Sequence, residues 1–175
     1  MKIKRTKIKD LYIIKINKFI DNRGQFFRNY CEKELLKVGK KKIVQSNISI
    51  NKKKFTLRGF HYQKNPSKEG KFITCISGKL FNVTIDLRKK SKTFLKIVIL
   101  EIDSKKKNLI FIPPGCANAF LTLEKNTIIN YLMTDFFKPN TYVRFNYKSA
   151  IVKKVKWPAK PVVISNEDKN AKKFL

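Results

Sequence analysis

In the segment 80–87, the side chains from Phe81 onward alternate strictly between apolar and polar, and this pattern constrains the fold more than any other in the chain. Successive side chains of a strand lie on opposite faces of its sheet, so the alternation predicts a β-strand with one face in a core. The other face carries short polar side chains and needs either water or a cavity. The apolar positions are Phe81, Val83, Ile85 and Leu87, and the polar positions are Asn82, Thr84 and Asp86.

Other stretches rich in β-branched and aromatic residues predict further short strands. Glycine and proline at 77–79 and 113–115 mark turns between them. Only residues 32–38, closed by Gly39, have a helical pattern, and one further turn is expected near 167–172. Many short strands at short spacing indicate an all-β sandwich or barrel. The further strands are expected at 11–16, 43–50, 72–76, 94–102, 109–112, 119–123 and 127–133.

The length of 175 residues and a hydrophobic content of 42% suit one domain over residues 1–175. The three cysteines, Cys31, Cys75 and Cys116, match neither a zinc spacing nor a disulfide framework. They are expected to be reduced thiols that act as small apolar fillers. No signal-peptide pattern and no apolar run of transmembrane length is visible, so we expect a cytoplasmic protein.

The formal net charge of +29 suggests nucleic-acid binding. Two observations weaken that interpretation. The lysines are spread along the whole chain, and only six of the 41 basic residues are arginines, which are the favoured readers of bases and phosphates. We therefore favour a solvated basic surface that also attracts small anions.

The chain has one histidine, His61, within the sequence LRGFHYQ at 57–63. Imidazole is the side chain best suited to carry protons near pH 7. In a regular strand His61 shares a face with Gly59 and not with Arg58, unless a bulge at Gly59 changes their directions. A hydrogen-bonded core histidine is the open alternative. A single histidine excludes any metal site built from two or three histidines.

Nine short motifs follow one another along nearly the whole chain. They are FIDNRGQF at 19–26, QSNIS at 45–49, LRGFHYQ at 57–63, GKFI at 70–73, GKLFNVTIDLR at 78–88, SKTF at 91–94, IPPG at 112–115, WP at 157–158 and SNED at 165–168. Each motif is weak alone, but together and in this order they make the chain resemble the dTDP-4-dehydrorhamnose 3,5-epimerase family of nucleotide-sugar epimerases.

The resemblance implies a cupin-type jelly roll with one or two short helices, and an isomerase. The implied reaction epimerises C3 and C5 of dTDP-4-dehydro-6-deoxy-D-glucose to give dTDP-4-dehydro-L-rhamnose, a precursor in surface polysaccharide (O-antigen) biosynthesis. The C4 ketone acidifies the hydrogens on both neighbouring carbons and accepts the electron pair as an enolate. The resemblance therefore implies neither a metal nor an organic cofactor.

The resemblance also implies roles for four side chains. His61 matches the family base and Asp168 matches the carboxylate that orients it. Tyr131 matches the tyrosine that returns a proton to the opposite face of the sugar. Lys71 matches the lysine near the C4 oxygen, where a cation stabilises the enolate. A surface tyrosine and a solvated carboxylate are the open alternatives for Tyr131 and Asp168.

The implied substrate-binding residues come from several motifs. Arg23 and Arg58 match arginines that contact the diphosphate. Gln45 and Asn47 match a polar segment that contacts the nucleotide sugar. Family members are homodimers in which the N-terminal part of one subunit approaches the other's pocket, so Arg23 and Phe26 are expected to act across the dimer.

The chain departs from the family pattern at two contact positions. Asn118 replaces a usual histidine, and it is expected to position the substrate by donating a hydrogen bond to a phosphate or sugar oxygen. Arg28 replaces a usual acidic residue. These changes leave open the alternative that the chain is a related epimerase, which acts on another nucleotide-linked 4-keto sugar such as a GDP- or CDP-linked hexose or heptose. A non-catalytic cupin that binds sugar or nucleic acid is a further alternative.

Overall fold

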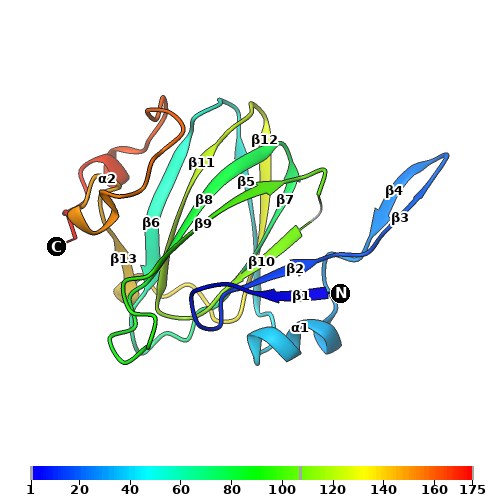
Figure 1. Cartoon of the computed structure of the whole chain (residues 1–175), viewed down its shortest axis with the longest axis horizontal. Helices are drawn as coiled ribbons and strands as arrows, with labels where there is room; N and C mark the ends of the chain where they lie inside the picture. The colour runs from blue at the N-terminus through cyan, green and yellow to red at the C-terminus, as the bar shows by residue number, and fades with distance from the viewer. Residues whose placement is uncertain (1, 107, 175) are drawn as a thin grey trace.

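The computed structural model describes residues 2–106 and 108–174, and these form mainly β-strands (Figure 1). Within these ranges the first sheet has six strands, in the order β1 (Lys2–Arg5), β2 (Tyr12–Lys15), β10 (Asn108–Ile112), β7 (Lys71–Ser77), β12 (Thr127–Met133) and β5 (Gln45–Asn51). The second sheet has five strands, in the order β13 (Tyr142–Arg144), β6 (Leu57–Gln63), β11 (Cys116–Thr122), β8 (Lys79–Asp86) and β9 (Ile97–Asp103). Neighbouring strands in both sheets are antiparallel, which confirms the predicted all-β sandwich.

The helices agree with the sequence pattern. Helix α1 (Glu32–Gly39) matches the expected helix at 32–38, and α2 (Asn166–Lys169) lies near the expected late turn. Two short 3₁₀ turns cover Pro139–Thr141 and Ala150–Val152. None of the helices in the described ranges has the length and apolar character needed to cross a membrane.

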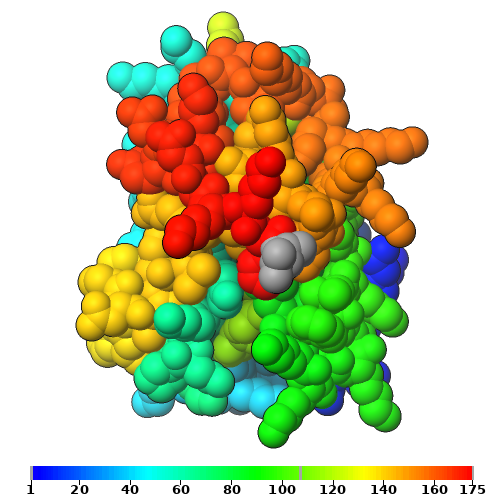
Figure 2. Space-filling view, turned by 90° about the vertical axis from the view of Figure 1, so that its left-hand side faces the viewer, coloured from blue at the N-terminus to red at the C-terminus, as the bar shows by residue number. Residues whose placement is uncertain are grey.

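Strand β8 shows how its alternating sequence is used. Its apolar side chains Val83 and Ile85 pack outward, in a cluster with Phe145 and Val152 from the C-terminal part of the chain. Figure 2 shows this C-terminal part, in orange and red, spread over the upper half of the viewed face. The polar side chains of Asn82, Thr84 and Asp86 are fully buried. The predicted polar face therefore belongs to the interior of the sandwich, where hydrogen bonds satisfy it.

The expected turn at 77–79 joins β7 to β8, which belong to different sheets. It is therefore a crossing between the two layers and not a hairpin within one sheet. Gly78 has a φ of +79°, and a Cβ there would lie 2.5 Å from Thr127 Oγ1. Both the backbone conformation and the close approach of Thr127 require glycine.

A two-stranded hairpin of β3 (Lys18–Asp21) and β4 (Gly24–Phe27) projects away from the two sheets (Figure 1). Its hydrophobic side chains Phe19, Ile20 and Phe26 are largely exposed. The sequence reasoning did not predict these strands, because neither has a buried face that would impose an apolar alternation.

Two cysteines lie in the core, as expected for apolar fillers. Cys75 and Cys116 are both buried in the cluster between the sheets. Burial raises the pKa of the Cys116 thiol to about 12. The positive charge of Arg88 lowers this pKa and the negative charge of Asp86 raises it, but both effects are smaller than that of burial. Cys116 is therefore a neutral thiol at physiological pH.

Asp86 anchors the loop that follows β8. Its carboxylate accepts hydrogen bonds from Arg88 Nε at 2.8 Å, Ser91 Oγ at 2.8 Å and Thr93 Oγ1 at 2.6 Å. Burial opposes ionisation of Asp86, but these hydrogen bonds outweigh it and lower the pKa to about 2 from an ordinary 3.8. The carboxylate therefore stabilises the folded state above about pH 4.

We expect this contribution to decrease as the pH falls below about 4 and to be lost below about pH 2, where Asp86 is protonated in both the folded and the unfolded state. The full loss is about 2 kcal/mol of unfolding free energy. Urea unfolding at pH 5 and at pH 2.5 measures most of it. The Asp86→Asn variant, less stable at neutral pH, loses correspondingly less over this range. Equal losses in the two proteins would assign the pH dependence to other carboxylates.

Candidate active site

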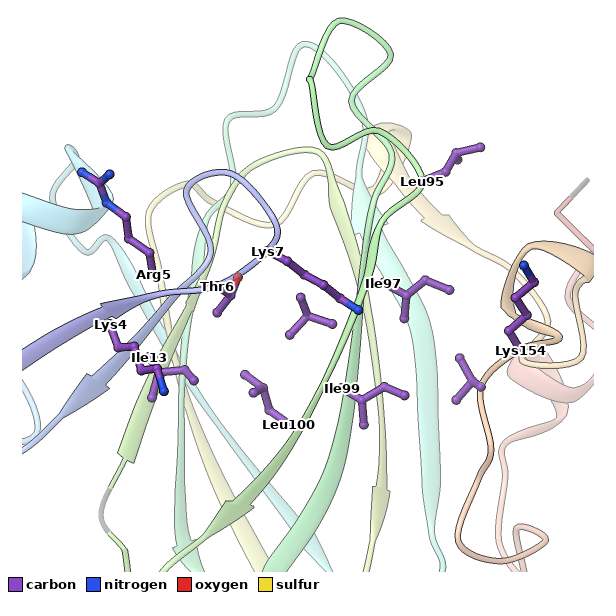
Figure 3. Close-up of a pocket in the computed structure, with 12 residues that line it drawn as sticks. Lys4, Arg5, Thr6, Lys7, Ile13, Leu95, Ile97, Ile99, Leu100 and Lys154 are labelled. Carbon is purple, nitrogen blue, oxygen red and sulfur yellow. The ribbon is translucent and has the colours of Figure 1, made fainter.

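Two cavities of similar size differ in their chemistry. The first, of about 670 Å³, lies beside β1 and β9 (Figure 3). Its floor includes Ile97 and Ile99, and lysines such as Lys7 and Lys154 stand at its edge. None of its lining residues is a carboxylate, an imidazole or a phenol. It contains no base that operates near neutral pH, so proton chemistry belongs elsewhere.

The second cavity, of about 550 Å³, lies between the two sheets and brings most of the expected site residues together. The first sheet contributes Gln45, Asn47, Ile48, Ser49, Lys71, Tyr131 and Met133, and the second contributes Arg58, His61, Asn118, Phe120, Tyr142 and Arg144. Glu69 and Phe137 come from the segments between strands. A ligand here would be held between two walls from different sheets.

A bulge at Gly59 allows Arg58 and His61 to line the same cavity. In the pairing of β6 with β11, His61 lies opposite Asn118 and Arg58 lies opposite Phe120. Two residues of β6 therefore face one residue of β11, which is the definition of a bulge. Phe60 belongs to the apolar cluster on the outer side of this sheet. The bulge that the sequence left open is present.

Only glycine fits at the bulge. Gly59 has a φ of +111°, which side chains rarely tolerate. A Cβ at this position would lie 2.5 Å from the Asn118 carbonyl oxygen and 2.7 Å from Ala119 Cα. Both contacts are to backbone atoms, so neither can be relieved by a rotamer change. The direction of His61 thus depends on the absence of a side chain two residues earlier.

His61 is paired with Asp168, as expected from the resemblance. His61 Nε2 lies 2.6 Å from Asp168 Oδ1, and the Gly59 N–H donates to Asp168 Oδ2 at 3.0 Å. Asp168 sits in α2, where its own N–H donates to the Ser165 hydroxyl that caps the helix. The short helix therefore delivers a buried carboxylate to the imidazole.

The charge of Asp168 fixes the tautomer of His61. Burial raises the pKa of Asp168, but hydrogen bonds from His61 and Gly59 outweigh it and lower the pKa below its ordinary value. An ionised carboxylate only accepts hydrogen bonds, so Nε2 of a neutral His61 carries the proton. Nδ1 is then the atom with a lone pair, ready to remove a proton from a ligand.

Tyr131 lies on the wall of the cavity formed by the first sheet, and His61 lies on the wall formed by the second. Burial raises the pKa of the Tyr131 phenol, and the positive charge of Arg58 opposes this only in part. The phenol is therefore protonated at neutral pH and can donate a proton. A base and an acid approach the cavity from different sheets.

The remaining expected residues of the cavity are held by specific hydrogen bonds. Arg58 Nε donates to Asn51 Oδ1 at 3.0 Å, and Gln45 Nε2 donates to Asn47 Oδ1 at 3.2 Å. The expected donation from Asn118 to a ligand needs correction. Its amide nitrogen donates to Asn82 Oδ1 at 2.7 Å and to the Val83 carbonyl at 3.0 Å, so its donors are already used inside the protein.

Three expected binding residues lie outside this cavity. Arg23 is on the exposed hairpin, where its guanidinium contacts Asp21 at 2.6 Å. Phe26 is on the same hairpin, and Arg28 lines a small hollow with Phe26 and Glu34. The hairpin extends outward from the two sheets (Figure 1), and none of its residues lines the cavity. Within one subunit these residues are therefore not part of the site.

Sequence reasoning missed several residues that line the cavity. Tyr142 and Arg144 lie on the short strand β13, which pairs with the strand that carries His61. The rings of Tyr142 and His61 have centroids 5.3 Å apart, and burial raises the pKa of Tyr142 to about 12. The spacing of two between Tyr142 and the scarce Arg144 was the available signal. Met133 lies two positions after Tyr131 in the strand expected at 127–133, so it shares a face with Tyr131. Glu69 and Phe137 gave no signal, because they lie between the expected strands.

The described part of the chain contains no group of three or more His, Cys, Asp or Glu side chains placed to hold a metal ion.

Known proteins are similar to this chain over nearly its full length. The family profile described as dTDP-4-dehydrorhamnose 3,5-epimerase matches residues 5–175. The dTDP-4-dehydrorhamnose 3,5-epimerase of Shigella flexneri is 32% identical, and the alignment covers 100% of this chain and 97% of the relative.

Solved structures agree. The Legionella pneumophila epimerase, in complex with dTDP-4-keto-L-rhamnose, matches with a TM-score of 0.91 at 30% identity, over 98% of this chain and 92% of that one. The Bacillus anthracis dTDP-4-dehydrorhamnose 3,5-epimerase, with TDP and PPi bound, matches with a TM-score of 0.93 at 28% identity, over 99% of both chains. The expected jelly-roll fold is confirmed.

Proposed function

The chain belongs to the dTDP-4-dehydrorhamnose 3,5-epimerase family, and we propose that its cavity performs this epimerisation with His61 as base and Tyr131 as acid. The substrate is dTDP-4-dehydro-6-deoxy-D-glucose, and the product is dTDP-4-dehydro-L-rhamnose, used for surface polysaccharide. The related Legionella enzyme holds dTDP-4-keto-L-rhamnose, which supports the dTDP-linked sugar as the ligand. The chain is thus an isomerase.

The observation that carries this proposal is the placement of His61 and Tyr131 on walls of one cavity that belong to different sheets. Nδ1 of His61 removes the proton from C3 or C5, and the electron pair of the broken C–H bond moves onto the C4 oxygen as an enolate. The enolate then collapses, and the carbon takes a proton from Tyr131 on its other face. One group cannot do both, because removal and return occur on opposite faces of the ring.

Cations and amides of the cavity have supporting roles in this proposal. Lys71 places its ammonium near the C4 oxygen and stabilises the developing negative charge. Arg58 binds the diphosphate, for which a planar guanidinium is well suited. Gln45 and Asn47, on the edge strand β5, contact the nucleotide sugar. Asn118 shapes the cavity floor through its bonds to β8.

The exposed hairpin supports a homodimer. Phe26 is 72% exposed and Phe19 is 69% exposed, which is unusual for phenylalanine on an isolated arm. In the proposed dimer, Arg23 and Phe26 of one subunit complete the cavity of the other, and Arg28 lies at the base of the arm. Residues 1–175 form one epimerase domain. A cytoplasmic location is proposed from the cysteine pattern, which lacks a disulfide framework.

Incubation with dTDP-, GDP- and CDP-linked 4-keto sugars in heavy water tests the proposal. We expect NMR to show deuterium at C3 and C5 of the dTDP-linked sugar and formation of its epimer, without net oxidation. Exchange only with a GDP- or CDP-linked sugar would identify a related epimerase. Exchange at one carbon would identify a mono-epimerase. No exchange with any of them would contradict an epimerase function.

A further inference from the structure

Glu69 is a buried carboxylate in the cavity for which neither the sequence motifs nor the family match supplies a role. Its Oε1 lies 3.1 Å from Lys71 Nζ, and the side chains of Glu69 and Lys71 are 4% and 13% exposed. Both residues line the cavity that holds His61. A buried carboxylate must be paired, so each of these two groups restricts where the other can lie.

Gln63 holds Glu69 from the other side. Its amide nitrogen donates to Glu69 Oε2 at 2.6 Å and to the Phe136 carbonyl at 3.1 Å. Its amide oxygen accepts from the Lys138 N–H at 2.7 Å and from the Thr141 hydroxyl at 2.8 Å. Gln63 is 3% exposed, and these four bonds use both its donors and both its lone pairs.

These bonds connect the two walls of the cavity. Gln63 ends β6 in the second sheet, Lys71 begins β7 in the first, and the segment 136–141 follows β12 of the first sheet. The same segment carries Phe137, whose ring packs edge-on against Tyr142 at 5.3 Å between centroids. Tyr142 in turn lies 5.3 Å from the His61 ring. One side chain therefore holds both the cation and the aromatic wall of the site.

We propose that Glu69 and Gln63 are positioning residues for the epimerisation, and that they act mainly through Lys71. This inference rests on the proposed function, in which Lys71 stabilises the enolate. An ammonium has three N–H donors. Glu69 takes one of them, which fixes the direction of the other two toward the space where a ketone oxygen would lie. Gln63 keeps Glu69 from rotating away.

A double-mutant cycle over Glu69 and Lys71 tests the proposal. We expect Glu69→Gln to lower kcat by about 10- to 100-fold, because a displacement of about 1 Å at a reacting centre can cost this much. KM and the affinity for dTDP change little, since the ground state is bound elsewhere. In a Lys71→Met background, Glu69→Gln changes kcat within about twofold, because its route of action is already gone.

The matched control is Glu101→Gln, which breaks a Lys79–Glu101 ion pair of 2.8 Å outside the cavity and leaves kcat unchanged. Equal losses from Glu69→Gln in both backgrounds, or a rise in KM alone, would overturn the positioning role. If Lys71→Met does not fold, the separation of kcat from KM in Glu69→Gln decides. No deuterium exchange by the unmodified protein would instead overturn the proposed function, and this inference with it.

Discussion

Replacing His61 with asparagine is expected to reduce deuterium exchange at both C3 and C5 by about 10²- to 10⁴-fold, the range for loss of a general base. His61 is the only imidazole in the chain, and Nδ1 is the atom left with a lone pair by the hydrogen bond to Asp168. The other candidates in the cavity are less suited, because the two phenols have raised pKa values and the Glu69 carboxylate is already paired with Lys71 and Gln63. Proton NMR in heavy water measures the rate.

The affinity for dTDP separates chemistry from binding in this experiment. We expect His61→Asn to bind dTDP as the unmodified protein does, since asparagine occupies less space and keeps a polar group beside Asp168. Calorimetric titration and a thermal unfolding curve check binding and folding. Rapid exchange by His61→Asn, at a rate near that of the unmodified protein, would transfer the role of base to another residue.

Replacing Tyr131 with phenylalanine is expected to affect the return of the proton more than its removal. The first step, catalysed by His61, continues and labels the substrate with deuterium through return from the same side. Formation of the epimer falls by about 10²-fold or more, because the acid on the opposite wall is gone. The ratio of exchange to epimer therefore rises, and NMR measures both in one sample.

Tyr142 offers a matched comparison, because it is a second partly buried tyrosine that lines the same cavity. It lies on β13, in the sheet that also carries His61, so it is not placed on the opposite wall. We expect Tyr142→Phe to alter substrate affinity without raising the ratio of exchange to epimer. A raised ratio for Tyr142→Phe, with Tyr131→Phe unaffected, would assign the acid to Tyr142.

The sequence predicted most of the strands because most of them have a buried face. Strand β5 is an exception, since its isoleucines suggested a strand although Ile48 and Ile50 are exposed. The strand β12 (Thr127–Met133) lies where the pattern placed it, and β8 differs by one residue at each end. The hairpin at 18–27 and the strand β1 escaped prediction because all or nearly all of their residues are exposed. An alternation of apolar and polar residues indicates that one face of a strand is buried, and it does not indicate hydrogen bonding between strands. A strand without a buried face therefore shows no such alternation in its sequence.

The sequence predicted the site residues that belong to a motif. It did not predict those that reach the site only through the packing of distant segments. His61 and Asp168 are 107 residues apart in the sequence. Their pairing was expected only because the motifs around them resemble those of a known family, and the structure places them in contact. The network around Gln63 needs contacts among three separate segments, which no local pattern encodes. The amide of Asn118 was expected to face a ligand, but its partner on β8 was not visible from the sequence.

The bulge at Gly59 makes the register of β6 a condition for catalysis. If the same residues paired as a regular strand without the bulge, Arg58 and His61, which are three positions apart, would lie on opposite faces of the sheet. One of the two would then face the apolar cluster on the outer side of the sheet, where Phe60 now packs. A substitution at Gly59 that removed the bulge would therefore separate the imidazole from the guanidinium, although neither of those residues is changed.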